Sequence, residues 1–279
     1  MKLIKRVSII SFVITTAVFA NNSIDKSVIE FEKSRFSKNE RVEIKNISIN
    51  MKKELPQKGW YGYIVDLDIK FAGKDVKAKD VIFSDGNVIS PELFDVKSGD
   101  SLKELIRPNL SSKYYDSSKL IAGSSSAKNR LVVFSDPLCP FCMDYVPDIA
   151  KYANEHKDSI ALYYYHFPLL RIHPASNALT KLMVIGKKKG IKDIELKVYK
   201  ADWDIYFEPK ETNQKKILDA FNKVFETKIT LEELDSKEIS AEVAQDISMG
   251  EEALVQGTPT IFVNGEYDKS KLKYQELGM

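Results

Sequence analysis

Cysteine and histidine are scarce in this sequence, and the scarcity limits the kinds of site it can build. The 279 residues contain two cysteines and three histidines. A structural zinc site needs four ligands. The cysteine pair supplies two, and His156, His166 and His173 have no paired ligand spacing. We therefore expect no metal site and no bound cofactor.

Charge of one sign is also lacking. The chain has 42 Lys and Arg against 40 Asp and Glu. Nucleic-acid-binding proteins normally carry a basic excess or a basic stripe, so we expect no nucleic-acid partner. The length and the 43% hydrophobic fraction allow one large domain or two ordinary ones.

The N-terminal apolar stretch, residues 7–19, is too short to span a bilayer comfortably. Positive residues precede it and Ala20 follows it, which is the pattern of a cleavable secretory signal peptide over residues 1–20. The alternative is an uncleaved membrane anchor. The pattern predicts an exported protein.

The two cysteines, Cys139 and Cys142, are separated only by Pro140 and Phe141. Exported cysteines usually meet an oxidising compartment and form disulfides. A bridge that closes so short a loop removes little chain entropy, so stability is a poor reason for it. The spacing therefore indicates a redox-active pair.

The surroundings of this pair explain which sulfur should react. Residues 129–134 form an apolar strand, and residues 143–156 have a helical pattern. Cys139 is then at a helix N-terminus, where unpaired N–H groups and a partial positive charge stabilise a thiolate. Pro140 suits the first helical turn, and Cys142, one turn deeper, can resolve a mixed disulfide formed at Cys139.

The remaining patterns predict two folded parts. Residues 41–105 show the alternation of antiparallel strands, strongest over residues 63–71, and indicate a small sheet. A strand at 160–167, helical patterns over much of 175–255 and a strand at 260–263 indicate an α/β fold around the cysteines. Between these parts, residues 107–129 break the pattern and could hold a short helix. We expect a signal peptide, a sheet-rich dimerisation domain, a linker and a catalytic domain, at residues 1–20, 21–106, 107–128 and 129–279.

The cysteine motif and the later Gly257-Thr258-Pro259 together resemble the thioredoxin fold. More narrowly, residues 134–142 resemble the active-site segment of the periplasmic DsbC/DsbG family. This resemblance implies a thioredoxin-like catalytic domain with a helical insertion. It also implies a small N-terminal α+β domain of cystatin-like fold, a linker helix and a V-shaped homodimer.

The resemblance also implies roles for single residues. Cys139 would be the exposed nucleophile and Cys142 the buried resolving thiol. Pro259 would be a cis-proline facing the cysteines. The substrate would be bound by four residues, Pro140, Phe141, Thr258 and Pro259.

One position departs from the wider thioredoxin pattern. Many thioredoxins carry a buried acid six residues before the first cysteine, and here that residue is Val133. The nearest acid is Asp136. Our hypothesis is that Asp136 is a local structural or substrate-contacting residue and not the proton acceptor; it could equally be a turn residue before Pro137.

The predicted function is a periplasmic thiol–disulfide oxidoreductase, of the isomerase or reductase type, that acts on exported proteins containing disulfides or thiols. Thr258 before Pro259 favours the isomerase branch by resemblance. A homodimer and a membrane redox partner protein are expected with it. Two alternatives stay open: a DsbA-like oxidase that donates its disulfide, and a non-redox periplasmic chaperone.

Overall fold

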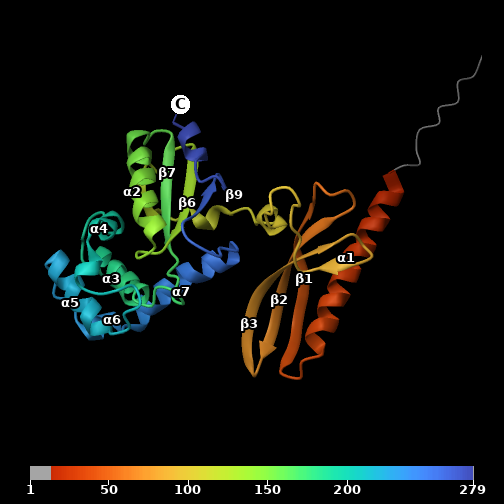
Figure 1. Cartoon of the computed structure of the whole chain (residues 1–279), viewed down its shortest axis with the longest axis horizontal. Coiled ribbons are helices and arrows are strands. Elements are labelled where there is room, and N and C mark those ends of the chain that lie inside the picture. Colours follow the sequence, from red (N-terminus) through yellow and green to blue (C-terminus); the bar gives the residue numbers. More distant parts are fainter. Residues whose placement is uncertain (1–13, 279) are drawn as a thin grey trace, which may run out of the picture. The chain divides into compact units, whose positions relative to one another are not determined.

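The computed structural model describes residues 14–278, in two compact units (Figure 1). The first unit ends at Ile106 and the second begins at Arg107. The first part of the predicted signal peptide lies outside the described residues, and helix α1 (Ile14–Ser37) begins within its last part. Within the described part of the chain, no helix combines the length and the apolar character that crossing a membrane requires.

The first unit is a four-stranded antiparallel sheet with α1 packed on it (Figure 1). The strands follow each other in sequence order, so each connection is a hairpin. Their bounds are β1 (Val42–Glu54), β2 (Tyr61–Phe71), β3 (Lys74–Ser84) and β4 (Ile89–Ser90). The fully buried core between helix and sheet comprises Val28, Ile47, Tyr63, Val65, Leu67 and Ile82.

The alternation in the sequence explains this unit. On β2, Tyr63, Val65 and Leu67 are buried, as the pattern predicts, while Phe71 at the strand end is exposed. Gly86 has a positive φ of 94° in the turn between β3 and β4, and the two strands pair beyond it. An Asp-Gly turn accepts this backbone conformation without strain. The predicted sheet is therefore confirmed, and the cystatin-like likeness stays a prediction.

The second unit contains a five-stranded sheet in the order β5-β7-β6-β8-β9. Only β6 and β7 run parallel, and the other neighbours are antiparallel. The bounds are β5 (Leu120–Gly123), β6 (Asn129–Ser135), β7 (Ile160–His166), β8 (Thr260–Val263) and β9 (Glu266–Tyr267). The central strand β6 ends just before the cysteine motif, which places the motif at an end of the sheet.

Helix α2 (Pro140–Glu155) follows β6 directly and connects it to β7. Five helices are then inserted between β7 and β8, as the sequence predicts. They are α3 (Ser176–Lys188), α4 (Ile194–Lys200), α5 (Gln214–Phe225), α6 (Leu231–Leu234) and α7 (Lys237–Glu252). In Figure 1, α3 to α6 gather into one cluster beside α2.

Side chains of β6 alternate between two cores. Leu131 and Val133 pack with α2 and the inserted helices on one face. Val132 and Phe134 pack on the other face, where Tyr114 and Val255 cover the sheet. Ser135 continues the first series by this alternation, so its side chain is on the α2 face.

The segment expected to be a linker helix has a different structure. Residues 107–128 hold two short 3₁₀ turns, at Ser112–Tyr114 and Ser117–Lys119, and then β5, which pairs with β7. Leu110 and Tyr114 are buried against the sheet. These apolar contacts keep the segment on the surface of the second unit, so it belongs to that unit and forms no α-helix.

Candidate active site

Cys139 is the N-cap residue of α2. Its backbone is extended, with φ −76° and ψ 120°, and Pro140 occupies the first turn of the helix. The Cys139 carbonyl accepts hydrogen bonds from the backbone N–H groups of Cys142 at 2.9 Å and Met143 at 3.0 Å. The helix therefore begins inside the motif, as predicted, with its unpaired N–H groups directed toward the Cys139 side chain.

The reacting sulfur is more buried than the sequence suggests. Cys139 is 4% exposed and Cys142 is fully buried, so the expectation of an exposed nucleophile is wrong for the residue as a whole. Phe141 between them is 75% exposed. The turn at the helix start directs Phe141 outward and both sulfurs inward, and the motif presents an aromatic ring to solvent beside a recessed thiol.

The loop before β8 lies against the recessed sulfur. Cys139 Sγ lies 3.4 Å from the carbonyl oxygen of Thr258, and the Thr258–Pro259 peptide bond is cis. Thr260 Oγ1 donates to the Gly257 carbonyl at 2.6 Å, which holds this loop in shape. Two segments far apart in the sequence therefore meet at one sulfur, and the cis geometry implied by the resemblance is confirmed.

Groups around its sulfur, above all the Cys142 thiol, make Cys139 acidic. A hydrogen bond from the Cys142 thiol is the largest cause that lowers the pKa of Cys139, to about 5. Thr258 and the backbone N–H groups of Cys142 and Phe141 lower it further, and burial opposes them. At neutral pH the sulfur is a thiolate, the form that attacks disulfides.

Cys142 has the opposite character. Burial raises its pKa far above that of an ordinary thiol, and the neighbouring Cys139 sulfur raises it as well. Ser135, Thr258 and the backbone of Asp136 lower the pKa of Cys142 and oppose that effect. The pair therefore consists of one thiolate and one thiol, which is the arrangement that a nucleophile and a resolving cysteine require.

Asp136 is a buried anchor of the loop that carries the motif. Its carboxylate is fully buried and accepts hydrogen bonds from the backbone N–H of Leu138 at 2.8 Å and of Leu169 at 2.7 Å. It also accepts one from Ser176 Oγ at 2.6 Å, and it lies 3.0 Å from Nδ1 of His173. These contacts support the structural role of Asp136, and the bond from Leu138 makes it a turn residue before Pro137 as well.

The comparisons with known proteins agree with this geometry. The family model described as thioredoxin matches residues 116–279, more than half of the chain. The chain belongs to the thioredoxin family. A search of curated proteins finds no match.

Solved structures similar to this thioredoxin-family chain include three bacterial proteins. BdbD from Bacillus subtilis, in its oxidised form, is 23% identical with a TM-score of 0.47, and the match covers 61% of this chain and 92% of that one. The catalytic domain of Proteus mirabilis ScsC is 19% identical, with a TM-score of 0.45 and coverage of 59% and 92%. DsbA2 from Pseudomonas aeruginosa is 19% identical, with a TM-score of 0.41 and coverage of 56% and 90%. All three TM-scores are below 0.5, so family membership rests on the match over residues 116–279.

Sequence reasoning missed several residues around the cysteines. Ser135 and Ser176 contact the motif or its anchor, and Tyr164 and Tyr199 lie behind the buried thiol. The alternation of β6 could have placed Ser135 on the α2 face. The position of Tyr199 depends on how the inserted helices pack, which no local pattern encodes. Among the described residues, no cluster of three or more His, Cys, Asp or Glu could hold a metal ion.

Proposed function

We propose that this thioredoxin-family protein is a thiol–disulfide oxidoreductase of the isomerase or reductase type, and that it acts on exported proteins. The observation that carries the proposal is the contrast within the motif. Cys139 is acidic and lies against the Thr258 carbonyl, while Cys142 behind it is buried and protonated.

Disulfide exchange at this pair takes two steps. The Cys139 thiolate attacks a disulfide of the client, forms a mixed disulfide with one client sulfur and releases the other as a thiolate. Cys142 then loses its proton, attacks Cys139 Sγ and releases the remaining client sulfur. The second step reduces the client by two electrons and oxidises the dithiol. In isomerisation, a client thiolate attacks the mixed disulfide instead and restores Cys139.

Client binding is assigned to the residues that surround the recessed sulfur. Phe141 offers an exposed aromatic surface, and the backbone at Thr258 and Pro259 borders the reacting atom. Pro140 completes the group at the start of α2. An extended client segment that lies along this border would bring its disulfide within reach of Cys139.

Location and partners follow from the sequence. The signal peptide predicted at residues 1–20 would export the chain to the periplasm, where its clients are secreted proteins. A dithiol that reduces clients must be reduced again in an oxidising compartment, which requires a redox partner protein in the membrane. The sheet edges of the first unit support the proposed homodimer, because β1 has one neighbour and β4 covers only two residues of β3.

A DsbA-like oxidase is the second candidate, and the lowered pKa of Cys139 favours it. A stabilised thiolate stabilises the reduced protein and makes the disulfide a stronger oxidant. Oxidase and reductase use the same two steps in opposite directions, and an isomerase must start from the reduced pair. The reduction potential and the cellular redox state of the pair therefore decide between the candidates.

The decisive experiment incubates the reduced protein with a client whose disulfides are scrambled, and follows the recovery of native client activity. The proposal predicts recovery by the wild type and none by Cys139→Ser. Rapid oxidation of a reduced client without any reshuffling of a scrambled one would establish the oxidase instead. Equal recovery with Cys139→Ser would point to a chaperone that works without thiol chemistry.

A further inference from the structure

The fully buried thiol of Cys142 must lose a proton before it can attack Cys139, and solvent does not reach it. Ser135, at the end of β6 on the α2 face of the sheet, acts on this sulfur and lowers the pKa of Cys142. Ser135 is itself fully buried, and its Oγ lies 2.6 Å from the hydroxyl oxygen of Tyr199 on α4. The Tyr199 oxygen lies 2.8 Å from the hydroxyl oxygen of Tyr164 on β7. These three hydroxyls, here called the hydroxyl ladder, form a row that begins at Ser135 near the thiol and ends at Tyr164.

The ladder can pass on a proton because each hydroxyl both donates and accepts. Tyr199 lies between two hydroxyls but has a single hydrogen, so it donates to one neighbour and accepts from the other. Its neighbours must take matching orientations, and the hydrogens of the ladder therefore shift together. Burial raises the pKa of both tyrosines well above the ordinary value, so neither becomes a stable phenolate along the way.

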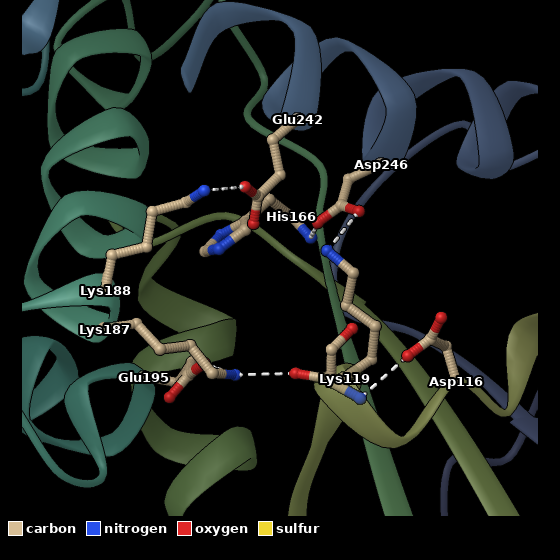
Figure 2. A network of polar contacts seen from close by, with 9 residues as sticks. Asp116, Lys119, His166, Lys187, Lys188, Glu195, Glu242 and Asp246 are labelled. Carbon is tan, nitrogen blue, oxygen red and sulfur yellow. Dashed lines mark hydrogen bonds and ion pairs between the residues drawn. The ribbon is translucent and has the colours of Figure 1, made fainter. Parts of the chain in front are cut away.

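A charged pair on the inserted helices lies within electrostatic range of Tyr164. The negative charge of Glu195 on α4 acts on the Tyr164 hydroxyl. Figure 2 shows Glu195 beside Lys187 of α3, and their charged groups are 2.7 Å apart. The Glu195 side chain is 7% exposed, whereas that of Lys187 is 43% exposed. A carboxylate at this place can accept a proton from the interior and release it to solvent.

We propose that Ser135, Tyr199 and Tyr164 form the route by which the Cys142 proton leaves, with Glu195 as its acceptor. The inference rests on the proposed function, because it concerns the second step of disulfide exchange. In that step the Cys142 proton moves to Ser135, each hydroxyl passes its own hydrogen onward, and Glu195 takes up one proton. The Cys142 thiolate then attacks Cys139, and the client sulfur leaves as a thiolate.

Other ionisable groups face the ladder, and each has a different role. Cys139 on α2 is bonded to the client sulfur at this step, and Asp136 after β6 is occupied by the hydrogen bonds of its loop. His166 on β7 packs edge-on against the Tyr164 ring, with centroids 5.0 Å apart. Its backbone N–H donates to the Asp246 carboxylate, as Figure 2 shows. Burial and the charges of Lys119 and Lys187 lower the pKa of His166 well below the ordinary value, so it stays neutral near pH 7.

The test separates the two steps by using dithiobis-nitrobenzoate as the probe. Cys139 breaks its S–S bond and releases one coloured nitrothiobenzoate anion. Cys142 then displaces the second anion from the mixed disulfide, so the two electrons lost by the dithiol are gained by the probe. Absorbance after rapid mixing with reduced full-length protein gives one phase for each step, and the first phase does not require Cys142 to lose its proton.

Tyr199→Phe and Tyr164→Phe keep the ring and remove the hydroxyl, and Ser135→Ala removes the contact with the thiol. We expect each to slow the second phase by about tenfold or more near pH 7 and to leave the first within about twofold. Glu195→Gln should slow the second phase as well.

Tyr114→Phe is the matched control. Tyr114 is 3% exposed, and its hydroxyl donates to the Met249 carbonyl at 2.9 Å on the other face of the sheet. This variant should leave both phases within about twofold of the wild type. Its thermal unfolding also gives the stability cost of removing one buried hydroxyl. A ladder variant that loses much more stability than this is poorly folded, and its slow second phase is then not evidence for the route.

Two results would overturn the ladder. One is a second phase within about twofold of the wild type in both folded tyrosine variants at every pH. The other is slowing by Ser135→Ala alone, which would reduce the route to one direct hydrogen bond. If the wild type itself releases no second anion, the proposed function fails and not only the route.

Discussion

Cys139 and Cys142 lie one helical turn apart and have acidities shifted in opposite directions. The thiol of Cys142 donates to the Cys139 sulfur, which lowers the pKa of Cys139 and raises its own. The acidity of each cysteine therefore depends on the other. Two predictions follow for Cys139 and one for the anchor beneath it.

The lowered pKa of Cys139 makes the stability of the reduced protein depend on pH. A group whose pKa is lower in the folded state contributes stability that is complete above its unfolded pKa, ordinarily 9.0, and is lost as the pH falls through about 5. Cys142 stays protonated in both states over most of this range. The free energy of unfolding of reduced wild type, minus that of Cys139→Ser, should therefore rise from about pH 5 to about pH 8. Urea unfolding with reductant present measures it, and a flat difference would contradict the acidity.

Removing the Cys142 thiol should make Cys139 less acidic. Its hydrogen bond is the largest cause that lowers the pKa of Cys139, so Cys142→Ala should raise that pKa above about 5. The rate of alkylation of Cys139 by iodoacetamide, measured against pH, follows the thiolate fraction and reports the pKa. An unchanged midpoint would mean that the helix N-terminus and Thr258 alone set the acidity.

Asp136→Asn should affect stability much more than resolution. Its buried carboxylate accepts hydrogen bonds from several donors, and an amide can accept only some of them. We expect a loss of about 2–4 kcal/mol in the free energy of unfolding. The second exchange phase should slow by less than about tenfold. Asp144→Asn, on the exposed side of α2, is the control and should change neither. A hundredfold slower resolution would instead make Asp136 the proton acceptor.

At the scale of elements, β5 depends on one glycine. Gly123 has a positive φ of 77°, and a Cβ there would clash with the carbonyl oxygen of Ile160 on β7. Gly190 also has a positive φ, 87°, but a Cβ there would meet open space. Gly190→Ala therefore measures the backbone strain alone, about 1 kcal/mol.

Gly123→Ala should cost the same strain and also disturb the pairing of β5 with β7, by about 2 kcal/mol or more beyond the control. Denaturant unfolding of both variants gives the difference. Equal costs would show that β7 moves freely enough to admit the methyl group.

The sequence predicts those elements in which apolar side chains recur regularly because one face packs on a single neighbouring element. The alternation on β2 faces one helix, and the apolar run before the motif is the buried centre of a sheet, so both were predictable. Residues 107–128 were not, because Leu110 and Tyr114 are held by contacts with a distant part of the chain. The motif and Thr258-Pro259 could be predicted from their own chemistry. The ladder could not, since it joins Ser135 to a tyrosine on an inserted helix.

At the scale of the whole molecule, we expect a homodimer. In the first unit β1 has an unpaired edge and β3 is only partly covered by β4, so main-chain groups there are available to a second copy. Light scattering of the mature full chain should give twice the mass of one chain. A monomer at every concentration would contradict the dimer, while leaving the exchange chemistry of the second unit intact.

The recessed position of Cys139 limits the folding stage at which a client can react. Only 4% of the residue is exposed, so its sulfur reaches a disulfide only when the client segment that carries the disulfide is flexible enough to fit around the site. On the proposed function, a finished protein keeps its bridges packed within its own surface and cannot present them in this way. An incompletely folded protein can present its disulfides to Cys139. Access alone would then distinguish immature clients from mature ones, so that repair stops by itself once folding is complete.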